Sequence, residues 1–184
     1  MSFHDISIST DILEIRPLSI DDYSNWLYGF KQRKVKQNEF DAEYLDVSNW
    51  DIHFFRQTVD SLNTLASKDE AYIFGIFIKH TGEHIGKLEF TVLQRNRFHW
   101  CMIGYHIHNQ YWNKGYASES LRTVDNIAEQ LGLHRIEAHI HPNNIQSIKV
   151  IEKNDFLFET KRDDFIFENN QWNDYLIYSK IIQS

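Results

Sequence analysis

The segment best suited to chemistry is Gln110-Tyr-Trp-Asn-Lys-Gly-Tyr-Ala117, between a predicted strand ending near His108 and a predicted helix starting near Tyr116. A loop in this position directs free main-chain N–H groups and a helix N-terminus at one point, where they can bind a pyrophosphate. Gly115 permits a positive φ, and Asn113 is one of the few non-glycine residue types that tolerate left-handed geometry. The pattern therefore predicts an anion site built from backbone.

A single glycine before a helix also occurs in tight turns for steric reasons alone, so both interpretations of this pattern stay open. The nucleotide-binding patterns GxxxxGK[ST] and GxGxxG are absent, and the chain has only 7 glycines. A Walker loop and a dinucleotide fingerprint are therefore excluded.

The elements that must position this loop follow from the spacing of apolar residues and from cap and turn signals. Before the loop we expect an edge strand near 11–18, a helix capped by Ser19, a helix capped by Ser48, and antiparallel strands near 71–78, 84–93 and 99–108. After it we expect a helix with an apolar face from Leu121 to Leu131 stopped by Gly132, a strand near 134–141, a short helix capped by Asn143 or Asn144, and strands near 156–168 and 172–182.

Antiparallel strands that lead into a strand–helix–strand crossover predict a mixed, mostly antiparallel sheet with helices on both faces. The fold class is therefore α/β, or α+β by a stricter naming. With 184 residues and 42% hydrophobic content, we expect one domain over residues 1–184, ordered outside the first ten residues.

Composition narrows the possible partners and compartments. The net charge of −7 disfavours nucleic acid and mildly favours basic partners, although acidic balance mostly serves solubility. Cys101 is the only cysteine, the segment MSFHDISIST is unlike a secretory signal, and no apolar run is long enough to span a bilayer, so we expect a cytoplasmic protein without membrane contact. His106 and His108, like His139 and His141, would share a strand face, but no third ligand recurs, so we expect no metal.

Residues 110–117 resemble the Q/R-x-x-G-x-G/A pyrophosphate loop of the GNAT acetyltransferase superfamily, with Asn113 where the first glycine usually stands. The resemblance covers about residues 11–182. Further segments resemble the RimJ/RimL branch in its usual order: Arg16-Pro-Leu18, Ile103-Gly-Tyr105, Gly115-Tyr-Ala-Ser-Glu119, His134-Arg-Ile-Glu-Ala138, Asn144-Ile-Gln-Ser147 and Glu152-Lys-Asn-Asp-Phe156, where Asp155 replaces a usual glycine. The resemblance implies an acetyl-CoA-dependent N-acetyltransferase with splayed strands at the CoA site.

The resemblance also implies the residues that hold acetyl-CoA. The backbone around Ile107 would bind the pantetheine arm, and Asn144 and Ser147 match the N-x-x-S motif near the arm and its sulfur. The pyrophosphate would bind the loop residues, mainly through main-chain N–H groups: Gln110, Trp112, Asn113, Lys114, Gly115, Tyr116 and Ala117. Lys114 either adds charge there or is a solvated lysine.

The catalytic residues are less clearly indicated. Ser147 either protonates the departing thiolate or caps its helix. Many relatives carry a glutamate directly before the I-G-Y segment, where this chain has Met102. His106 is our hypothesis for the base because its ordinary pKa suits proton transfer, with Tyr105 and Glu89 on strands that border the cleft.

The acceptor is a primary amine, either a protein N-terminus or a small molecule, which would enter from the side of the first two helices and the last hairpin. We expect direct transfer, since a lone strand cysteine such as Cys101 is more often a buried hydrophobe than a nucleophile. The alternatives are a catalytically silent CoA-binding regulatory module and a structural interaction protein. A homodimer through Phe165–Phe167 and Tyr175–Tyr178 is possible, although such residues are more often core.

Overall fold

The computed structural model describes residues 3–183, and its centre is one eight-stranded mixed sheet in the order β1-β2-β3-β4-β5-β6-β8-β7. The strands are β1 (Ile8–Ser9), β2 (Leu13–Arg16), β3 (Ala71–Ile78), β4 (His84–Gln94), β5 (Trp100–Ile107), β6 (Arg135–Ile140), β7 (Leu157–Glu168) and β8 (Gln171–Ile181). The helices are α1 (Tyr23–Lys31), α2 (Ile52–Ser67), α3 (Tyr116–Leu121), α4 (Val124–Gln130) and α5 (Ile145–Glu152), with 3-10 turns η1 (Phe3–Asp5), η2 (Ile20–Asp22) and η3 (Asn109–Tyr111). The predicted class is confirmed.

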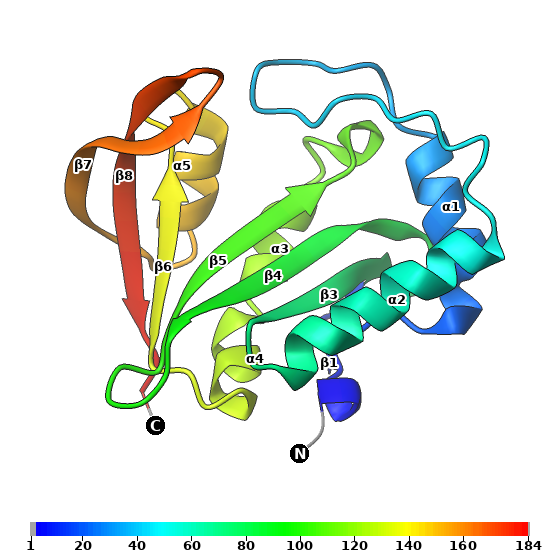
Figure 1. The fold of residues 1–184 in the computed structure, drawn as a ribbon, viewed down its shortest axis with the longest axis horizontal. Helices are drawn as coiled ribbons and strands as arrows, with labels where there is room; N and C mark the ends of the chain where they lie inside the picture. The colour runs from blue at the N-terminus through cyan, green and yellow to red at the C-terminus, as the bar shows by residue number, and fades with distance from the viewer. Residues whose placement is uncertain (1–2, 184) are drawn as a thin grey trace.

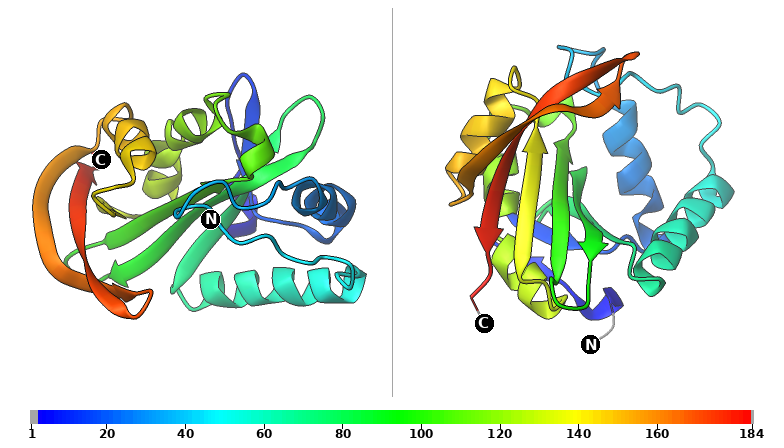
Figure 2. Two further views of the ribbon diagram at one scale, coloured as in Figure 1. Left: turned by 90° about the horizontal axis from the view of Figure 1, so that it is seen from above. Right: turned by 60° about the vertical axis from the view of Figure 1, so that its left-hand side comes forward.

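Helices cover both faces of the sheet (Figures 1 and 2). On one face, α1 and α2 bury a small cluster that includes Trp26, Phe55, Val59 and Phe77. On the other face, the apolar side of α3, α4 and α5 joins the larger core cluster. The β-branched and aromatic residues of β3, most of them buried, supply side chains to both clusters, as expected for a strand covered on both sides.

The parallel pair β5 and β6 diverges along its length (Figure 1). The two strands pair only at Trp100↔Arg135, Cys101↔Ile136 and Met102↔Glu137. Beyond Met102, β5 remains paired with β4 up to Gly86↔Ile107, whereas β6 remains paired with β8. The splay between these neighbours is the feature that the resemblance implies.

Two predicted elements differ in detail. The helix expected from Tyr116 to Leu131 is divided into α3 and α4, because Thr123 Oγ1 and N both bond to Ser120 O and tighten the chain between them. The helix α2 is capped by Asp51, whose carboxylate accepts from Phe54 N, so the predicted cap Ser48 was wrong.

The N-terminal region also departs from expectation. The strand β2 was predicted as an edge, but it lies between β1 and β3, and Pro17 follows it. Residues 3–10 are ordered, since Ile6 is buried in the main core. No helix among the described residues has the length and apolar character needed to cross a bilayer.

Of the two closing strands, β8 contributes buried residues to the core and β7 contributes none. Tyr175, Ile177 and Tyr178 are buried, while Phe167 and Trp172 are exposed on the outer hairpin. Most of the residues proposed for a dimer on β8 are therefore occupied within one chain, and the homodimer stays a prediction that light scattering tests.

Candidate active site

The loop between β5 and α3 has the left-handed geometry that its sequence predicted. Asn113 has φ 62° and Gly115 has φ 81°. Gly115 is the N-cap of α3, and no side chain bonds to this helix start. The first N–H groups of the helix, from Tyr116 and Ala117 onward, therefore remain for a ligand.

Two predicted loop side chains fasten the loop to the sheet and to α1. Gln110 Nε2 donates to Gly29 O at 2.8 Å, and Trp112 Nε1 donates to Ile107 O at 2.7 Å. Gln110 and Trp112 thus fix the loop conformation, which leaves ligand binding to the main chain.

The cationic side chain of the loop lies on its outer surface. Lys114 is exposed, and its Nζ lies 5.4 Å from the centroid of the Tyr111 ring. A cation–π contact of this kind holds the ammonium loosely near the loop. Lys114 is thus placed to add charge without forming the site.

Two predicted catalytic residues meet beside the splayed strands. Tyr105 OH lies 2.6 Å from Ser147 Oγ. Asn144 Oδ1 accepts from Ser147 N at 3.2 Å, so Asn144 caps α5 and the Ser147 hydroxyl is left to Tyr105. Burial raises the pKa of Tyr105 to about 12, so its hydroxyl keeps its proton at neutral pH. The two hydroxyls therefore form a hydrogen-bonded pair beside the splayed strands.

His106 does not join this pair. Successive residues of a strand point to opposite faces, so His106 lies across the sheet from Tyr105. Burial, aided by the Arg33 guanidinium, lowers the pKa of His106 to about 4. Its Nε2 is buried without a hydrogen-bond partner among the described residues. Glu89, the other candidate, is bonded to Lys87 and Thr91.

A cavity of about 310 Å³ lies next to Ser147. Its walls come from four segments distant in sequence: Glu39 and Phe40; His139, Ile140 and His141 of β6 and its end; Asn144 and Ser147 of α5; and Glu168 and Tyr175 of the last hairpin. The sequence predicted Asn144 and Ser147 as site residues and the last hairpin as part of the acceptor side, whereas Glu39 and Phe40 were not predicted individually. The alternation of His139 and His141 also pointed to a shared strand face here.

Residues 32–47, which we call the strap, connect α1 to α2 and contribute Glu39 and Phe40 to the cavity. Arg33 Nη2 pairs with Asp41 Oδ1 at 3.0 Å, and both side chains are buried. Asn109 Nδ2 donates to Asp41 Oδ2 at 2.8 Å, and Asn109 Oδ1 accepts from Lys34 N at 2.7 Å. The strap is thereby fastened directly to the residue before the predicted pyrophosphate loop.

Residues 13–157 match the family model described as acetyltransferase (GNAT) domain. The chain belongs to the GNAT acetyltransferase family. This match covers most of the chain and includes the loop, β5, β6 and α5.

Individual relatives agree with this assignment. This chain is 28% identical over 164 residues to the probable N-acetyltransferase YjcK of Bacillus subtilis, and the alignment covers 89% of this chain and 90% of the relative. It is 28% identical over 117 residues to the [ribosomal protein uS5]-alanine N-acetyltransferase of Escherichia coli, covering 63% and 60% of the two chains. The solved structure of Mycobacterium smegmatis RimJ in complex with CoA-disulfide matches its fold with a TM-score of 0.76 at 19% identity, over 97% of this chain and 88% of that one.

The acetyltransferase uses acetyl-CoA as its acetyl donor. The main chain of β5 suits the pantetheine arm of that donor. His108 N bonds to Ile85 O on the β4 side, so the alternation of a strand turns the main-chain groups of Ile103, Tyr105 and Ile107 toward β6. Pairing with β6 has already ended at Met102, and Ile107 O accepts from the Trp112 indole. Beyond Met102 the main chain of β5 therefore carries polar groups that do not pair with β6, as an amide-bearing arm requires.

The comparisons support an N-acetyltransferase and give no support to a silent CoA-binding module. Cys101 is fully buried, and burial raises its pKa to about 12, so a reactive thiolate does not form at neutral pH. No group of three or more His, Cys, Asp or Glu side chains within residues 3–183 is arranged to hold a metal ion.

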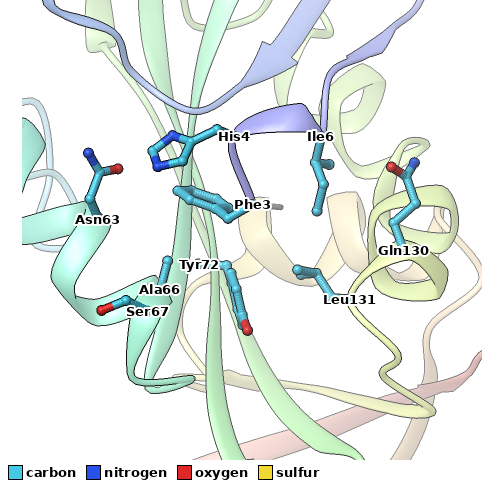
Figure 3. Close-up of a pocket in the computed structure, with 9 residues that line it drawn as sticks. All are labelled: Phe3, His4, Ile6, Asn63, Ala66, Ser67, Tyr72, Gln130 and Leu131. Carbon is cyan, nitrogen blue, oxygen red and sulfur yellow. The ribbon is translucent and has the colours of Figure 1, made fainter. Parts of the chain in front are cut away.

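Another cavity, of about 350 Å³, lies away from the loop and Ser147, between η1, α2 and the end of α4 (Figure 3). Its walls combine apolar groups with a few amides and hydroxyls, and none of the predicted site residues lines it. We assign no role to it in acetyl transfer.

Proposed function

We propose that this N-acetyltransferase moves the acetyl group directly from acetyl-CoA to a primary amine while both are bound. The observation that carries the proposal is the 2.6 Å contact between Tyr105 OH and Ser147 Oγ beside the splayed strands. This pair lies next to the part of β5 that does not pair with β6 and suits the pantetheine arm, and Ser147 borders the cavity that suits an acceptor. The donor and the acceptor would therefore approach Ser147 from two sides.

On this proposal, acetyl-CoA supplies the acetyl group as a thioester and the protein supplies position and protons. The main chain of residues 112–117 holds the pyrophosphate, and the strand groups of Tyr105 and Ile107 face the arm. Ser147 gives a proton to the departing sulfur and regains one through Tyr105. Asn144 holds the Ser147 backbone so that the hydroxyl keeps this direction.

We propose that the acceptor is the α-amine of a protein N-terminus. The Escherichia coli relative, a [ribosomal protein uS5]-alanine N-acetyltransferase, supports this class. The carboxylates of Glu39 and Glu168 in the cavity wall suit a cationic ammonium. The exposed strap residues Tyr44 and Leu45 offer apolar surface for the residues that follow an N-terminus.

A matched peptide panel tests the acceptor class. One peptide begins with a free alanine, a second has that α-amine blocked but carries a lysine, and a third acceptor is a polyamine. We expect release of CoA and acetylation at the α-amine of the first peptide only. Turnover confined to the lysine peptide or the polyamine would contradict this acceptor class while leaving acetyl transfer intact.

A further inference from the structure

The strand β6 carries a buried carboxylate–imidazole pair that the roles above do not use. Glu137 and His139 are two residues apart on a strand, so their side chains share a face. Glu137 Oε2 lies 2.9 Å from His139 Nε2. Arg135 donates to the other oxygen, Oε1, from Nε at 3.0 Å and from Nη2 at 2.8 Å. The guanidinium thus favours the ionised carboxylate.

The pairing with Glu137 determines which nitrogen of His139 is free. An ionised carboxylate can only accept, so His139 Nε2 donates to it. A neutral imidazole has one N–H, so the lone pair of His139 lies on Nδ1. Within residues 3–183, no protein group hydrogen-bonds to His139 Nδ1. The imidazole is therefore oriented, with its basic nitrogen unoccupied.

His139 lies at the wall where an acceptor would enter. It borders the cavity of about 310 Å³ together with Asn144 and Ser147. The last parallel pair of β5 and β6 is Met102↔Glu137, so His139 stands just beyond the point where the strands separate. Glu137 is thus paired with Met102, the last residue of β5 that pairs with β6.

We propose that His139, held in place by Glu137, is the proton acceptor for the incoming ammonium group. The assignment rests on the proposed function, because it concerns the acceptor of that same reaction. His139 would be a catalytic residue that touches the amine, and Glu137 a positioning residue that acts through it.

An N–H bond of the ammonium breaks, and its proton passes to His139 Nδ1. The nitrogen lone pair then forms a bond to the acetyl carbonyl carbon, and the carbon–sulfur bond breaks. Ser147 gives its proton to the sulfur, Tyr105 restores the proton of Ser147, and Tyr105 takes the second proton from the nitrogen. His139 finally releases its proton to water, so the products are an amide, a thiol and one proton.

Charged and titratable groups face the pair from each neighbouring element. They are Arg135 and His141 on β6 and at its end, Arg162 and Glu168 on β7, Tyr175 on β8, Glu159 on β7 beside Arg135, and Glu39 on the strap; the Phe165 ring packs 5.4 Å from the imidazole. The group that hydrogen-bonds to the imidazole is Glu137 itself. Removing its charge should make the imidazolium form of His139 less stable.

The variants His139→Gln and Glu137→Gln test the proposal in the intact enzyme, with the amine that wild type turns over best. Glutamine can still donate to Glu137 but cannot take a proton, so we expect His139→Gln to lower kcat about a hundredfold, with the KM for acetyl-CoA little changed. We expect Glu137→Gln to shift the acidic limb of the kcat/KM profile to lower pH. A loss of the limb in His106→Gln, with His139→Gln unaffected, would overturn the assignment.

A second measurement needs no acceptor and therefore separates this inference from the proposed function. Imidazole ¹⁵N NMR of the wild-type protein, with the His139 signals assigned through His139→Gln, should show the proton of neutral His139 on Nε2. The proton should lose this preference in Glu137→Gln. A wild-type His139 protonated on Nδ1 would overturn the inference, whereas failure of every peptide in the panel would contradict the acceptor class alone.

Discussion

The two sides of Ser147 are built in different ways. The donor side, β5 with residues 108–117 and the start of α5, uses main-chain groups fixed by local geometry, as at Gly115 and Asn144. The acceptor side, the strap with α1 and the last hairpin, uses buried polar side chains brought together from distant segments, as in Arg33–Asp41. Local backbone sites tolerate many side chains, whereas buried polar contacts depend on particular partners. Variants on each side should therefore differ in their effects on stability and turnover.

The largest effect is expected where the strap depends on a buried charge. Asp41→Ala leaves the Arg33 guanidinium buried without its carboxylate, so we expect a loss of about 3–5 kcal/mol in the free energy of unfolding. Urea denaturation measures this loss. The matched control is Glu43→Ala in the exposed strap pair Lys36–Glu43, for which we expect about 0–1 kcal/mol. Equal effects of the two variants would show that the strap does not depend on Asp41.

The next effect concerns acid stability. Burial lowers the pKa of His84 to about 4, below its unfolded value of 6.5, so the unfolded chain binds the proton more readily. The resulting stability is full above about pH 6.5 and is lost as pH falls toward about 4, by about 3 kcal/mol. Urea denaturation at several pH values should show this loss reduced in His84→Leu and retained in a variant of the exposed His80. Parallel pH slopes for wild type and His84→Leu would contradict it.

On the donor side, Ser147→Ala should lower kcat about a hundredfold, because the departing sulfur loses its proton source. Tyr105→Phe keeps the serine and should cost less, since it removes only the partner at 2.6 Å. Steady-state rates with the best amine measure both. A Ser147→Ala enzyme with wild-type kcat would remove Ser147 from the reaction.

The smallest effect is expected from the loss of a helix cap, which two caps in the chain allow to be compared. Asn144→Ala and Asp51→Ala each remove a side chain that accepts from a helix N–H, at 3.2 Å and 2.9 Å, and each should cost about 1 kcal/mol of stability. Only Asn144→Ala should also reduce kcat, because it loosens the backbone of Ser147. Thermal denaturation and kinetics together check this. A kinetic defect in Asp51→Ala would show that cap loss acts through general destabilisation.

The same contrast explains what the sequence could predict. The strands β3 to β6, the cap at Asn144 and the left-handed residues Asn113 and Gly115 follow from local patterns, and the structure confirms them. The apolar spacing predicted one continuous helix, and the break between α3 and α4 was not predicted. The hydrogen bonds from Thr123 to Ser120 O compete with that continuous helix.

The acceptor side could not be predicted in the same way. The strap has no periodic apolar pattern, and its shape depends on Asp41 meeting Arg33 and Asn109. The hypothesis that His106 is the base relied on its ordinary pKa, which burial lowers to about 4. Both depend on contacts between segments far apart in the chain, which sequence spacing does not encode.

The backbone-built donor site is tested most directly by calorimetric titration of wild type, Gly115→Val and Gly132→Val with acetyl-CoA. Both glycines have positive φ, of 81° and 63°, and neither has an atom within 4 Å of an added Cβ, so the two substitutions impose similar backbone strain. Gly115 starts α3 in the predicted pyrophosphate loop, whereas Gly132 follows α4. We predict that folded Gly115→Val loses acetyl-CoA binding and that Gly132→Val keeps it. Unchanged affinity in Gly115→Val would contradict the backbone-built donor site.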